Sequence, residues 1–345
     1  MAEDTASRIN QRWVLAKRPV GEPTEDCFAL EAVPVGDLAK GEILVETHYL
    51  SLDPYMRGRM RDAKSYAEPL AIGEVITGES VGLVVESRAE AYAVGDAVAV
   101  HHGWQSLHRI PTADPSIMPI DTSLAPMSAW LGVVGMPGRT AFFGLQRVGK
   151  PEPGETLVVS AASGAVGSVA GQLGKILGLR VVGIAGGPDK CGYCVSELGF
   201  DACVDYKQPD LDTALAAACP DGIDVYFENV GGAVTRAVAP HLNPGARVPI
   251  CGFVSLYNSE DDLSQVETPF TLFAALDPQP EHRFFLVGEW RDEWMDASRE
   301  LAGWIASSRL RYRETIASGF ASAPSAFRGL LAGKNFGKQL VRVAS

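Results

Sequence analysis

The stretch ASGAVG, residues 162–167, places small residues at the spacing of a phosphate-binding turn. It follows the apolar run ETLVVSA and precedes SVAGQLGKILG, whose apolar residues have helical spacing. The dinucleotide fingerprint G-x-G-x-x-G occurs at such a strand-to-helix junction, and here its positions are Ala162, Gly164 and Gly167. Gly164 would let the backbone approach a pyrophosphate, and Gly167 would let the helix pack against the strand. With the N–H groups of the helix start, this turn predicts dinucleotide binding.

The end of the next apolar run, RVVGIA at residues 180–185, indicates which dinucleotide binds. In an NAD site an acidic residue near this point accepts hydrogen bonds from the ribose 2′-OH, but here Gly186 and Gly187 follow. Nothing at that position would repel a 2′-phosphate, and Lys190 could bind one. The alternative for Lys190 is a solvated lysine, although a cation in a first helical turn is unfavourable unless an anion is near. The sequence therefore predicts NADP(H).

The cysteines and histidines do not have the spacing of a metal site. Cys27 is the only cysteine in the first 190 residues, and His101 and His102 are adjacent, so on a strand they would point to opposite faces. We interpret both histidines as structural or pocket-lining. Cys191 and Cys194 form a CxxC that could be a redox pair or half a zinc site, and we predict two free thiols on a helix. The sequence predicts no metal.

The composition is that of an ordinary globular protein of two domains. The chain has 345 residues, 46% of them hydrophobic, and lacks the ~18 consecutive apolar residues of a membrane span. Its net charge of −12 argues against binding nucleic acid or an anionic membrane. The polar MAEDTASRINQRW at the N-terminus is no secretion signal, so we expect a cytoplasmic protein.

The sequence pattern changes once along the chain, at about residue 126. Residues 1–125 contain short β-branched runs broken by Gly, Asp and Pro, which predict a β-barrel-like domain. From residue 126 strands and helices alternate, which predicts a doubly wound parallel sheet and an α/β fold class. We predict a strand in FFLVG, a helix in WMDASRELAGWIASSRL, a β pattern in the C-terminal KQLVRVAS, and a long loop at about 258–281.

Several stretches together resemble the zinc-independent branch of the medium-chain dehydrogenase/reductase superfamily. They are LSLDPYMRGRM, GMPGRTAFFGL, AASGAVGS, GIAGGPDKC, ENVGG, CGFVSLYN and APSAFRGLLAGKNFGKQLV. Within that branch, the chain is similar to prostaglandin reductases (leukotriene B4 12-hydroxydehydrogenases), curcumin reductases and plant alkenal double-bond reductases. The resemblance implies a GroES-like catalytic domain at residues 1–125 and 306–345, a Rossmann domain at 126–305, and a homodimer.

The resemblance also implies site residues. The implied cofactor-binding residues are Gly164, Ala165, Val166 and Gly167 at the pyrophosphate, Lys190 and Tyr206 at the 2′-phosphate, Asn229 near the sheet edge, and Cys251, Gly252, Phe253, Tyr257, Phe285, Leu286, Val287 and Asn335 at the nicotinamide half. The Gly-His-Glu of the zinc enzymes reads Thr77-Gly78-Glu79 here, without its histidine. Cys194 and the loop at 258–281 depart from the group's pattern, and the loop borders the implied substrate pocket.

Without a metal, hydride addition to a C=C bond conjugated with a carbonyl is easier than oxidation of an unactivated alcohol. Charge collects on the carbonyl oxygen, which needs a hydrogen-bond donor, and a neutral tyrosine can be that donor. By the resemblance Tyr257 and Tyr66 are the candidate catalytic groups, and Tyr55 lines the substrate pocket. The predicted function is NADPH-dependent reduction of α,β-unsaturated ketones and aldehydes. The alternatives are a quinone oxidoreductase and a non-catalytic NADPH-binding structural or sensor protein.

Overall fold

The chain forms two compact units in the computed structural model, which describes residues 8–62, 67–259 and 265–344. Unit 1 comprises residues 1–131, 315–335 and 339–345, and unit 2 comprises residues 132–314 and 336–338. The predicted change of domain at residue 306 differs from this division. The residues up to Glu314 stay with unit 2 partly because the Gln172 side chain hydrogen-bonds both the N–H and the carbonyl oxygen of Arg311.

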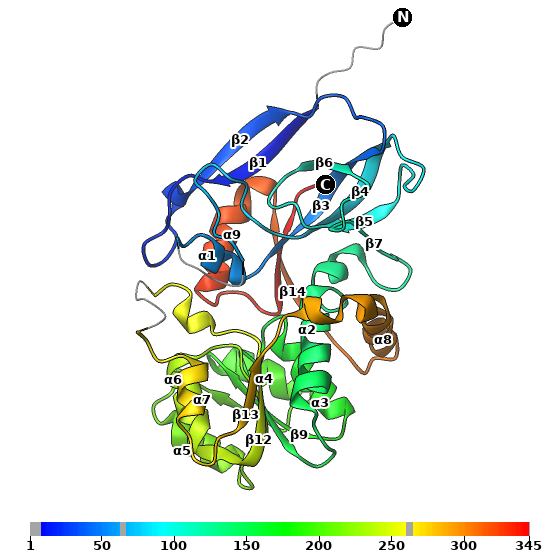
Figure 1. Cartoon of the computed structure of the whole chain (residues 1–345). Coiled ribbons are helices and arrows are strands. Elements are labelled where there is room, and N and C mark those ends of the chain that lie inside the picture. Colours follow the sequence, from blue (N-terminus) through cyan, green and yellow to red (C-terminus); the bar gives the residue numbers. More distant parts are fainter. Residues whose placement is uncertain (1–7, 63–66, 260–264, 345) are drawn as a thin grey trace, which may run out of the picture. The chain divides into compact units, whose positions relative to one another are not determined.

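Unit 1 is built on antiparallel strands, as predicted for the N-terminal part of the chain (Figure 1). Its main sheet has the order β14-β15-β3-β4-β5-β7, and β6 pairs with β3. These strands are β3 Glu42–Leu52, β4 Ser80–Ser87, β5 Ala97–Val100, β6 Leu107–Pro111, β7 Met118–Pro119, β14 Glu314–Ser318 and β15 Lys338–Arg342. A second sheet pairs β1 (Ile9–Leu15) with β2 (Phe28–Pro34), and the α-helices are α1 (Tyr55–Arg59) and α9 (Ala323–Leu331).

Unit 2 contains a parallel sheet of six strands in the order β10-β9-β8-β11-β12-β13. The strands are β8 Thr156–Ser160, β9 Arg180–Ala185, β10 Ala202–Asp205, β11 Ile223–Phe227, β12 Leu242–Ile250 and β13 Glu281–Phe284. The chain reverses direction through the sheet between β8 and β11, so this is a topological switch point. The predicted doubly wound sheet is confirmed.

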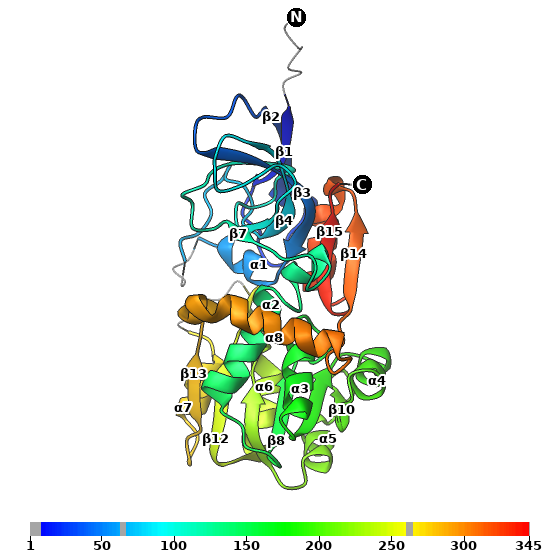
Figure 2. The ribbon, with the colours of Figure 1, turned by 90° about the vertical axis from the view of Figure 1, so that its right-hand side faces the viewer.

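Helices cover both faces of this sheet (Figures 1 and 2). Figure 1 shows α5 (Leu211–Ala218), α6 (Gly232–Val238) and α7 (Pro269–Ala274) on one side, and α2 (Met136–Phe143) and α3 (Gly167–Ile176) on the other. The side view in Figure 2 places α8 (Trp294–Ala306) beside α2 and α3, while α4 (Pro188–Ser196) packs on β9 and β10. Because helices cover both faces of the sheet, the side chains of the central strands β8, β9 and β11 are nearly all buried. The edge strands β10 and β13 are only partly buried.

The predicted long loop at 258–281 is wrong in part, because it contains α7. Thr268 caps this helix: its hydroxyl accepts the N–H of Thr271, and Pro269 occupies the first turn. Phe270 and Phe273 then pack on the apolar core of unit 2. A Thr-Pro start with a hydroxyl residue three positions later is a capping pattern, and this signal in the sequence was missed.

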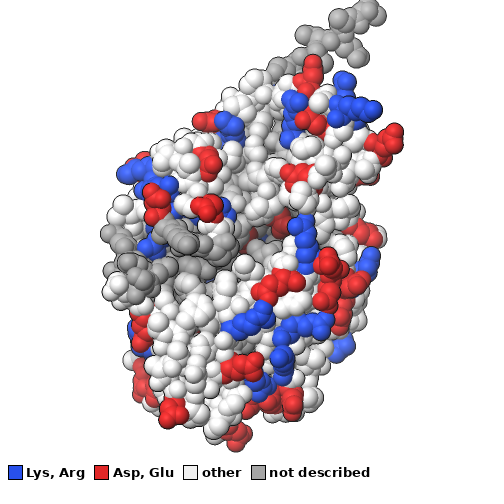
Figure 3. Space-filling view, viewed as in Figure 1, with Lys and Arg blue, Asp and Glu red and all other residues white. Residues whose placement is uncertain are grey.

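Acidic and basic side chains are interspersed on the face of the molecule in Figure 3. No single sign of charge therefore dominates that face, although the chain as a whole carries a net charge of −12. Among the described residues, no helix has both the length and the apolar character needed to cross a membrane.

Candidate active site

In the turn between β8 and α3 the backbone of the last residue lies so close to the end of β8 that this position requires a glycine. An added Cβ on Gly167 would lie 2.4 Å from the carbonyl oxygen of Ala161, and one on Gly164 would lie 3.1 Å from the same atom. α3 therefore begins directly against the end of β8, as the dinucleotide fingerprint requires. Val166, the N-cap, makes no side-chain capping hydrogen bond. The helix start thus presents the positive end of its dipole without a side-chain cap, which suits a phosphate.

A segment near the C-terminus is hydrogen-bonded to the same turn. Gly337 forms a parallel β-bridge with Gly164, and its N–H donates to the carbonyl oxygen of Ser163 at 2.9 Å. Gly337 has φ of +60°, and an added Cβ would lie 1.9 Å from the carbonyl oxygen of Arg313. Another residue type could be accommodated there only by moving the backbone. The second half of the GKNFGK motif is thereby held at the predicted phosphate turn, and Asn335 directly precedes it.

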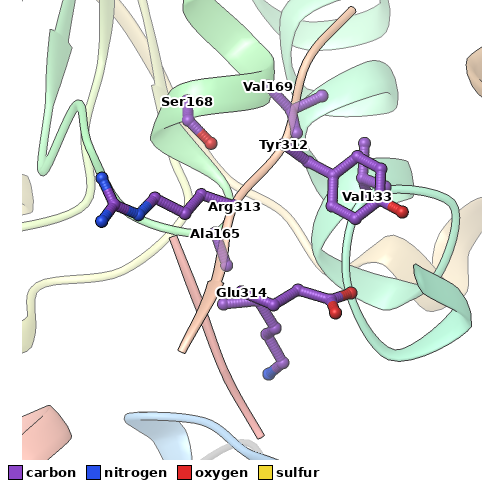
Figure 4. Close-up of a pocket in the computed structure, with 8 residues that line it drawn as sticks. Val133, Ala165, Ser168, Val169, Tyr312, Arg313 and Glu314 are labelled. Carbon is purple, nitrogen blue, oxygen red and sulfur yellow. The ribbon is translucent and has the colours of Figure 1, made fainter. Parts of the chain in front are cut away.

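A small cavity lies beside this turn, at the start of α3 (Figure 4). The side chains of Tyr312 and Arg313 point in opposite directions from their segment. The Tyr312 ring points toward Val133, and the Arg313 side chain points away from it. The cavity measures about 10 Å³, roughly the space of one water molecule, so it is no cofactor or substrate site. Its lining consists of Val133, Ala165, Ser168, Val169, Tyr312, Arg313, Glu314 and Lys338.

Two lysines and a tyrosine gather at the end of β9. An added Cβ on Gly186 would lie 3.0 Å from the Tyr206 hydroxyl oxygen and 3.1 Å from Lys207 Cε. Burial lowers the pKa of Lys190, and the positive charge of Lys207 lowers it further. Two cations and a hydroxyl therefore lie together where a 2′-phosphate is predicted. Lys207 was not predicted from the sequence, where its only signal was its position next to Tyr206.

One acidic residue does lie near the two glycines, but it is on the neighbouring strand. Asp205, the last residue of β10, accepts the N–H of Gly187 at 2.8 Å and the N–H of Lys207 at 3.0 Å. These two hydrogen bonds lower the pKa of its carboxyl group. The carboxylate thus fixes the backbone around the glycines.

The ring of Phe336 joins Lys190 to the C-terminal segment. Lys190 Nζ lies 5.5 Å from the ring centroid, and the Arg313 guanidinium carbon lies 4.6 Å from it. Tyr193 of α4 meets the same ring edge-on, with centroids 6.0 Å apart. These cation–π and aromatic contacts restrict where the Lys190 ammonium can lie.

The CxxC pair lies on α4, as predicted. None of the six cysteines forms a disulfide, and all six lie within the described part of the chain. Cys194 is fully buried and Cys191 partly buried.

The carboxyl ends of β8 and β11 are joined through Asn229. Its backbone N–H donates to Ser160 Oγ at 2.8 Å, and its Nδ2 donates to the Ser160 carbonyl oxygen, also at 2.8 Å. The side chain of Asn229 therefore has a defined position at the switch point, where doubly wound sheets bind ligands.

The Tyr257 hydroxyl lies directly over the carboxyl end of β12. An added Cβ on Gly252 would lie 2.9 Å from this oxygen, so the phenol folds back over the strand end. The ring packs edge-on against Phe253, with centroids 6.0 Å apart, and the short helix η5 (Val254–Leu256) makes the reversal. Cys251 lies at the same strand end, and burial raises the pKa of its thiol to about 12. The structure thus brings the predicted run 251–257 together at one edge of the sheet.

The predicted strand Phe285–Val287 is wrong in its bounds. β13 ends at Phe284, and Val287 already begins the short helix η6 (Val287–Glu293). Phe285 is buried against Phe227 and Trp290, and an added Cβ on Gly144 would lie 2.3 Å from its ring. The pairing ends at Phe284 because its partner Ile250 is the last residue of β12. Leu286 is exposed, and its N–H donates to Glu289.

With the geometry described, comparison with known proteins identifies the family. A model of the N-terminal domain of oxidoreductases matches residues 11–118, and a model described as zinc-binding dehydrogenase matches residues 165–302. The NADPH-dependent curcumin reductase of Escherichia coli is 46% identical over 338 residues, which cover 97% of each chain.

The chain belongs to the medium-chain dehydrogenase/reductase superfamily.

Two further members of the superfamily are similar over nearly the whole chain. The 2-alkenal reductase (NADP⁺-dependent) of Nicotiana tabacum is 38% identical, over 100% of this chain and 99% of its own. The structure of CurA from Vibrio vulnificus in complex with NADPH has a TM-score of 0.90 and 45% identity, covering 97% of this chain and 99% of that one. The resemblance to the reductase group is thereby confirmed.

The description "zinc-binding dehydrogenase" implies a zinc ion, but the residues of this chain do not fit one. Across residues 8–62, 67–259 and 265–344, no group of three or more His, Cys, Asp or Glu side chains could hold a metal ion. Cys27 is buried in an apolar cluster of unit 1 with Leu15 and Trp104. Thr77, at the position of the zinc enzymes' Gly-His-Glu, instead hydrogen-bonds His101 Nε2 at 3.3 Å.

One of the predicted pocket tyrosines, Tyr55, belongs to unit 1. Tyr55 begins α1 and is partly buried against an apolar cluster that includes Leu52 and Met56. Tyr66 lies outside the described residues, so its predicted role stays a prediction.

Proposed function

We propose that this protein reduces the C=C bond of α,β-unsaturated ketones and aldehydes with NADPH. The chain is an NADP-dependent oxidoreductase of the superfamily, similar to proteins named for curcumin and 2-alkenal reduction. The observation that carries the proposal is the Tyr257 hydroxyl at the carboxyl end of β12. A neutral phenol there suits the stabilisation of charge on a carbonyl oxygen.

We assign the cofactor to the carboxyl edge of the parallel sheet. The turn from Gly164 to Gly167 would hold the pyrophosphate, and Lys190 with Tyr206 would hold the 2′-phosphate. The close approach of α3 to β8 and the two lysines around Gly186 support this assignment, so the residues present fit NADP(H). The nicotinamide half would lie against Asn229, the run 251–253 and the Phe285–Val287 stretch, with Asn335 completing its contacts.

In the proposed mechanism the protein stabilises an enolate. NADPH, held by the residues named above, would supply the hydride that the β-carbon of the substrate accepts. Tyr257 donates a hydrogen bond to the carbonyl oxygen as negative charge develops there, and a proton from the phenol or from water then reaches the α-carbon. Tyr66 and Tyr55 would position the substrate.

NADPH consumption with a panel of enones, enals and quinones tests the proposal. We expect turnover of conjugated ketones or aldehydes, with the saturated carbonyl compound as the product. Turnover of quinones alone would replace the proposal with the quinone oxidoreductase. Tight NADPH binding without turnover of either class would support a non-catalytic protein.

The resemblance also implies a homodimer, which we propose here, and we propose separately that the protein is cytoplasmic. Size-exclusion chromatography with light scattering should give twice the 36.7 kDa of the chain. A single-chain mass at micromolar concentration would contradict the dimer.

A further inference from the structure

A buried carboxylate, Glu228, lies at the switch point of the parallel sheet and was not predicted from the sequence. Glu228 is fully buried and directly precedes Asn229. Its Oε1 accepts four hydrogen bonds: from Val230 N at 2.7 Å, Gly231 N at 3.0 Å, Tyr226 Oη at 3.0 Å and Ser160 Oγ at 3.1 Å. The other oxygen, Oε2, is hydrogen-bonded to Thr235 of α6.

The backbone of Glu228 ties a third strand into the same cluster. Its carbonyl oxygen accepts the N–H of Cys251 at 2.9 Å and the N–H of Gly252 at 3.2 Å, and its own N–H donates to the Pro249 carbonyl oxygen. One residue thus joins the carboxyl ends of β8, β11 and β12. Gly252 is also the residue over which the Tyr257 hydroxyl lies.

The donors around Glu228 favour its charged form. Burial raises the pKa of the carboxyl group above its ordinary value, and hydrogen bonds from Thr235, Val230 and Gly231 offset only part of that rise. Two of the four donors to Oε1 are backbone N–H groups, which can only donate. The other titratable groups of the cluster are neutral near pH 7, because burial and the charge of Glu228 raise the pKa of Tyr226 and bring that of Cys251 to about 12.

The strand order indicates which half of the cofactor lies near this charge. In a doubly wound sheet the dinucleotide crosses the switch point, with one half on each side. The glycine turn and the lysines around Gly186 belong to β8, β9 and β10, so the adenosine half lies on that side. The nicotinamide half therefore lies beyond β11 and β12, next to the strand ends that Glu228 joins.

We infer that Glu228 is a positioning residue whose buried negative charge favours the oxidised nicotinamide and so promotes hydride donation. The nicotinamide ring is neutral in NADPH and positive in NADP⁺, so a nearby anion stabilises the product form of the cofactor. Unit charges on the order of 10 Å apart, at an effective dielectric of about 20, change an equilibrium constant roughly tenfold. The inference rests on the proposed cofactor binding.

The test is the ratio of two dissociation constants, Kd for NADP⁺ over Kd for NADPH, measured by titration calorimetry. Glu228→Gln removes the charge and keeps the shape, and we expect the ratio to rise about three- to twentyfold. A tenfold rise corresponds to about 30 mV in the potential of the bound two-electron couple. Tyr226→Phe is the matched control: it removes one hydrogen bond from the same oxygen and keeps the charge, so its ratio should stay within twofold of wild type.

Glu228→Asp distinguishes the effect of the charge from the effect of the position of the carboxyl group. It is also the variant to measure if Glu228→Gln does not fold. It keeps the charge on a shorter side chain, so both cofactors should bind more weakly with an unchanged ratio. The inference fails if the ratio of the two dissociation constants is unchanged in Glu228→Gln. It also fails if this ratio rises in Glu228→Asp by the three- to twentyfold expected for Glu228→Gln. If the wild-type protein binds neither NADP⁺ nor NADPH, the proposed function fails and not merely the role of Glu228.

Discussion

One hydroxyl group accounts for the acid chemistry in the proposed mechanism. Tyr257→Phe keeps the ring against Phe253 and removes only the oxygen that lies over Gly252. We expect kcat for a good enone to fall roughly ten- to a thousandfold, because one enolate donor is lost while solvent still supplies the proton. Steady-state kinetics, with NADPH binding measured separately, checks this.

Tyr312→Phe is the control for Tyr257→Phe. Tyr312 lines the one-water cavity of unit 2, so removing its hydroxyl should leave kcat near wild type. Tyr66→Phe should raise KM more than it lowers kcat, as expected of a positioning group. If Tyr66→Phe abolishes turnover while Tyr257→Phe does not, the two tyrosines have the opposite roles.

The two lysines near Gly186 should each contribute to the choice of cofactor. Lys190→Ala should weaken NADPH binding about ten- to a hundredfold, the range of a charge-assisted hydrogen bond. Lys207→Ala should weaken it roughly three- to tenfold, because this side chain is exposed and solvent screens its charge. NADH is the internal control, and its Kd should hardly change in either variant. Equal weakening of both cofactors would show that the lysines do not bind the 2′-phosphate.

At the scale of an element, one glycine, Gly337, allows the C-terminal segment to pair with the glycine turn. Gly337→Ala would place a Cβ 1.9 Å from the Arg313 carbonyl oxygen, so the backbone at residue 337 must move and its hydrogen bond to the Ser163 carbonyl oxygen is put at risk. We expect NADPH affinity to fall more than tenfold and the free energy of unfolding to drop by more than about 2 kcal/mol.

Gly333→Ala is the matched control in the same motif. Gly333 also has a positive φ, of +65°, but an added Cβ there would meet nothing within 4 Å. Its cost should be the backbone strain alone, about 1 kcal/mol, with NADPH affinity retained. Equal losses from both substitutions would mean that strain, and not the contact with Arg313, fixes the segment.

At the scale of the whole molecule, the stability of the fold should depend on a buried histidine. Burial in unit 1 lowers the pKa of His108 from 6.5 to about 3, and its Nε2 lies 2.9 Å from Ser80 Oγ and 3.0 Å from Thr47 Oγ1. The unfolded chain therefore binds the proton more readily. The stabilisation is fully present above pH 6.5 and is lost as the pH falls toward 3.

Urea unfolding at pH 7 and pH 5 measures this effect. The wild type should lose about 2 kcal/mol from this group over that interval, and His108→Gln should lose correspondingly less. Equal losses in both proteins would show that His108 does not control the acid sensitivity.

The activity of the whole enzyme should not depend on a metal ion. The described residues offer no group of three metal ligands, and Cys27 is enclosed by apolar side chains. Prolonged EDTA treatment should leave turnover unchanged, with much less than one zinc per chain by elemental analysis. Stoichiometric zinc whose removal abolishes turnover would contradict this prediction.

The sequence by itself determined the features that depend on neighbouring residues. The junction of β8, the glycine turn and α3 was predicted because a strand, a tight turn and a helix start each have a local pattern. The same holds for the alternating strands and helices of unit 2 and for the glycines after β9, which indicated NADP(H). The capping pattern of α7 was equally local, and was missed.

Only the tertiary structure decided the features that join distant parts of the chain. Lys207 meets Gly186 because β10 pairs with β9, and Gly337 reaches Ser163 across more than half of the sequence. The ring of Phe285 packs against Phe227 and Trp290, because packing depends on which side chains meet in space. The carboxyl group of Glu228 is hydrogen-bonded to residues of β8, β11 and α6 together. No local pattern records the contact between Ser160 and Glu228, since these two residues lie 68 positions apart in the sequence.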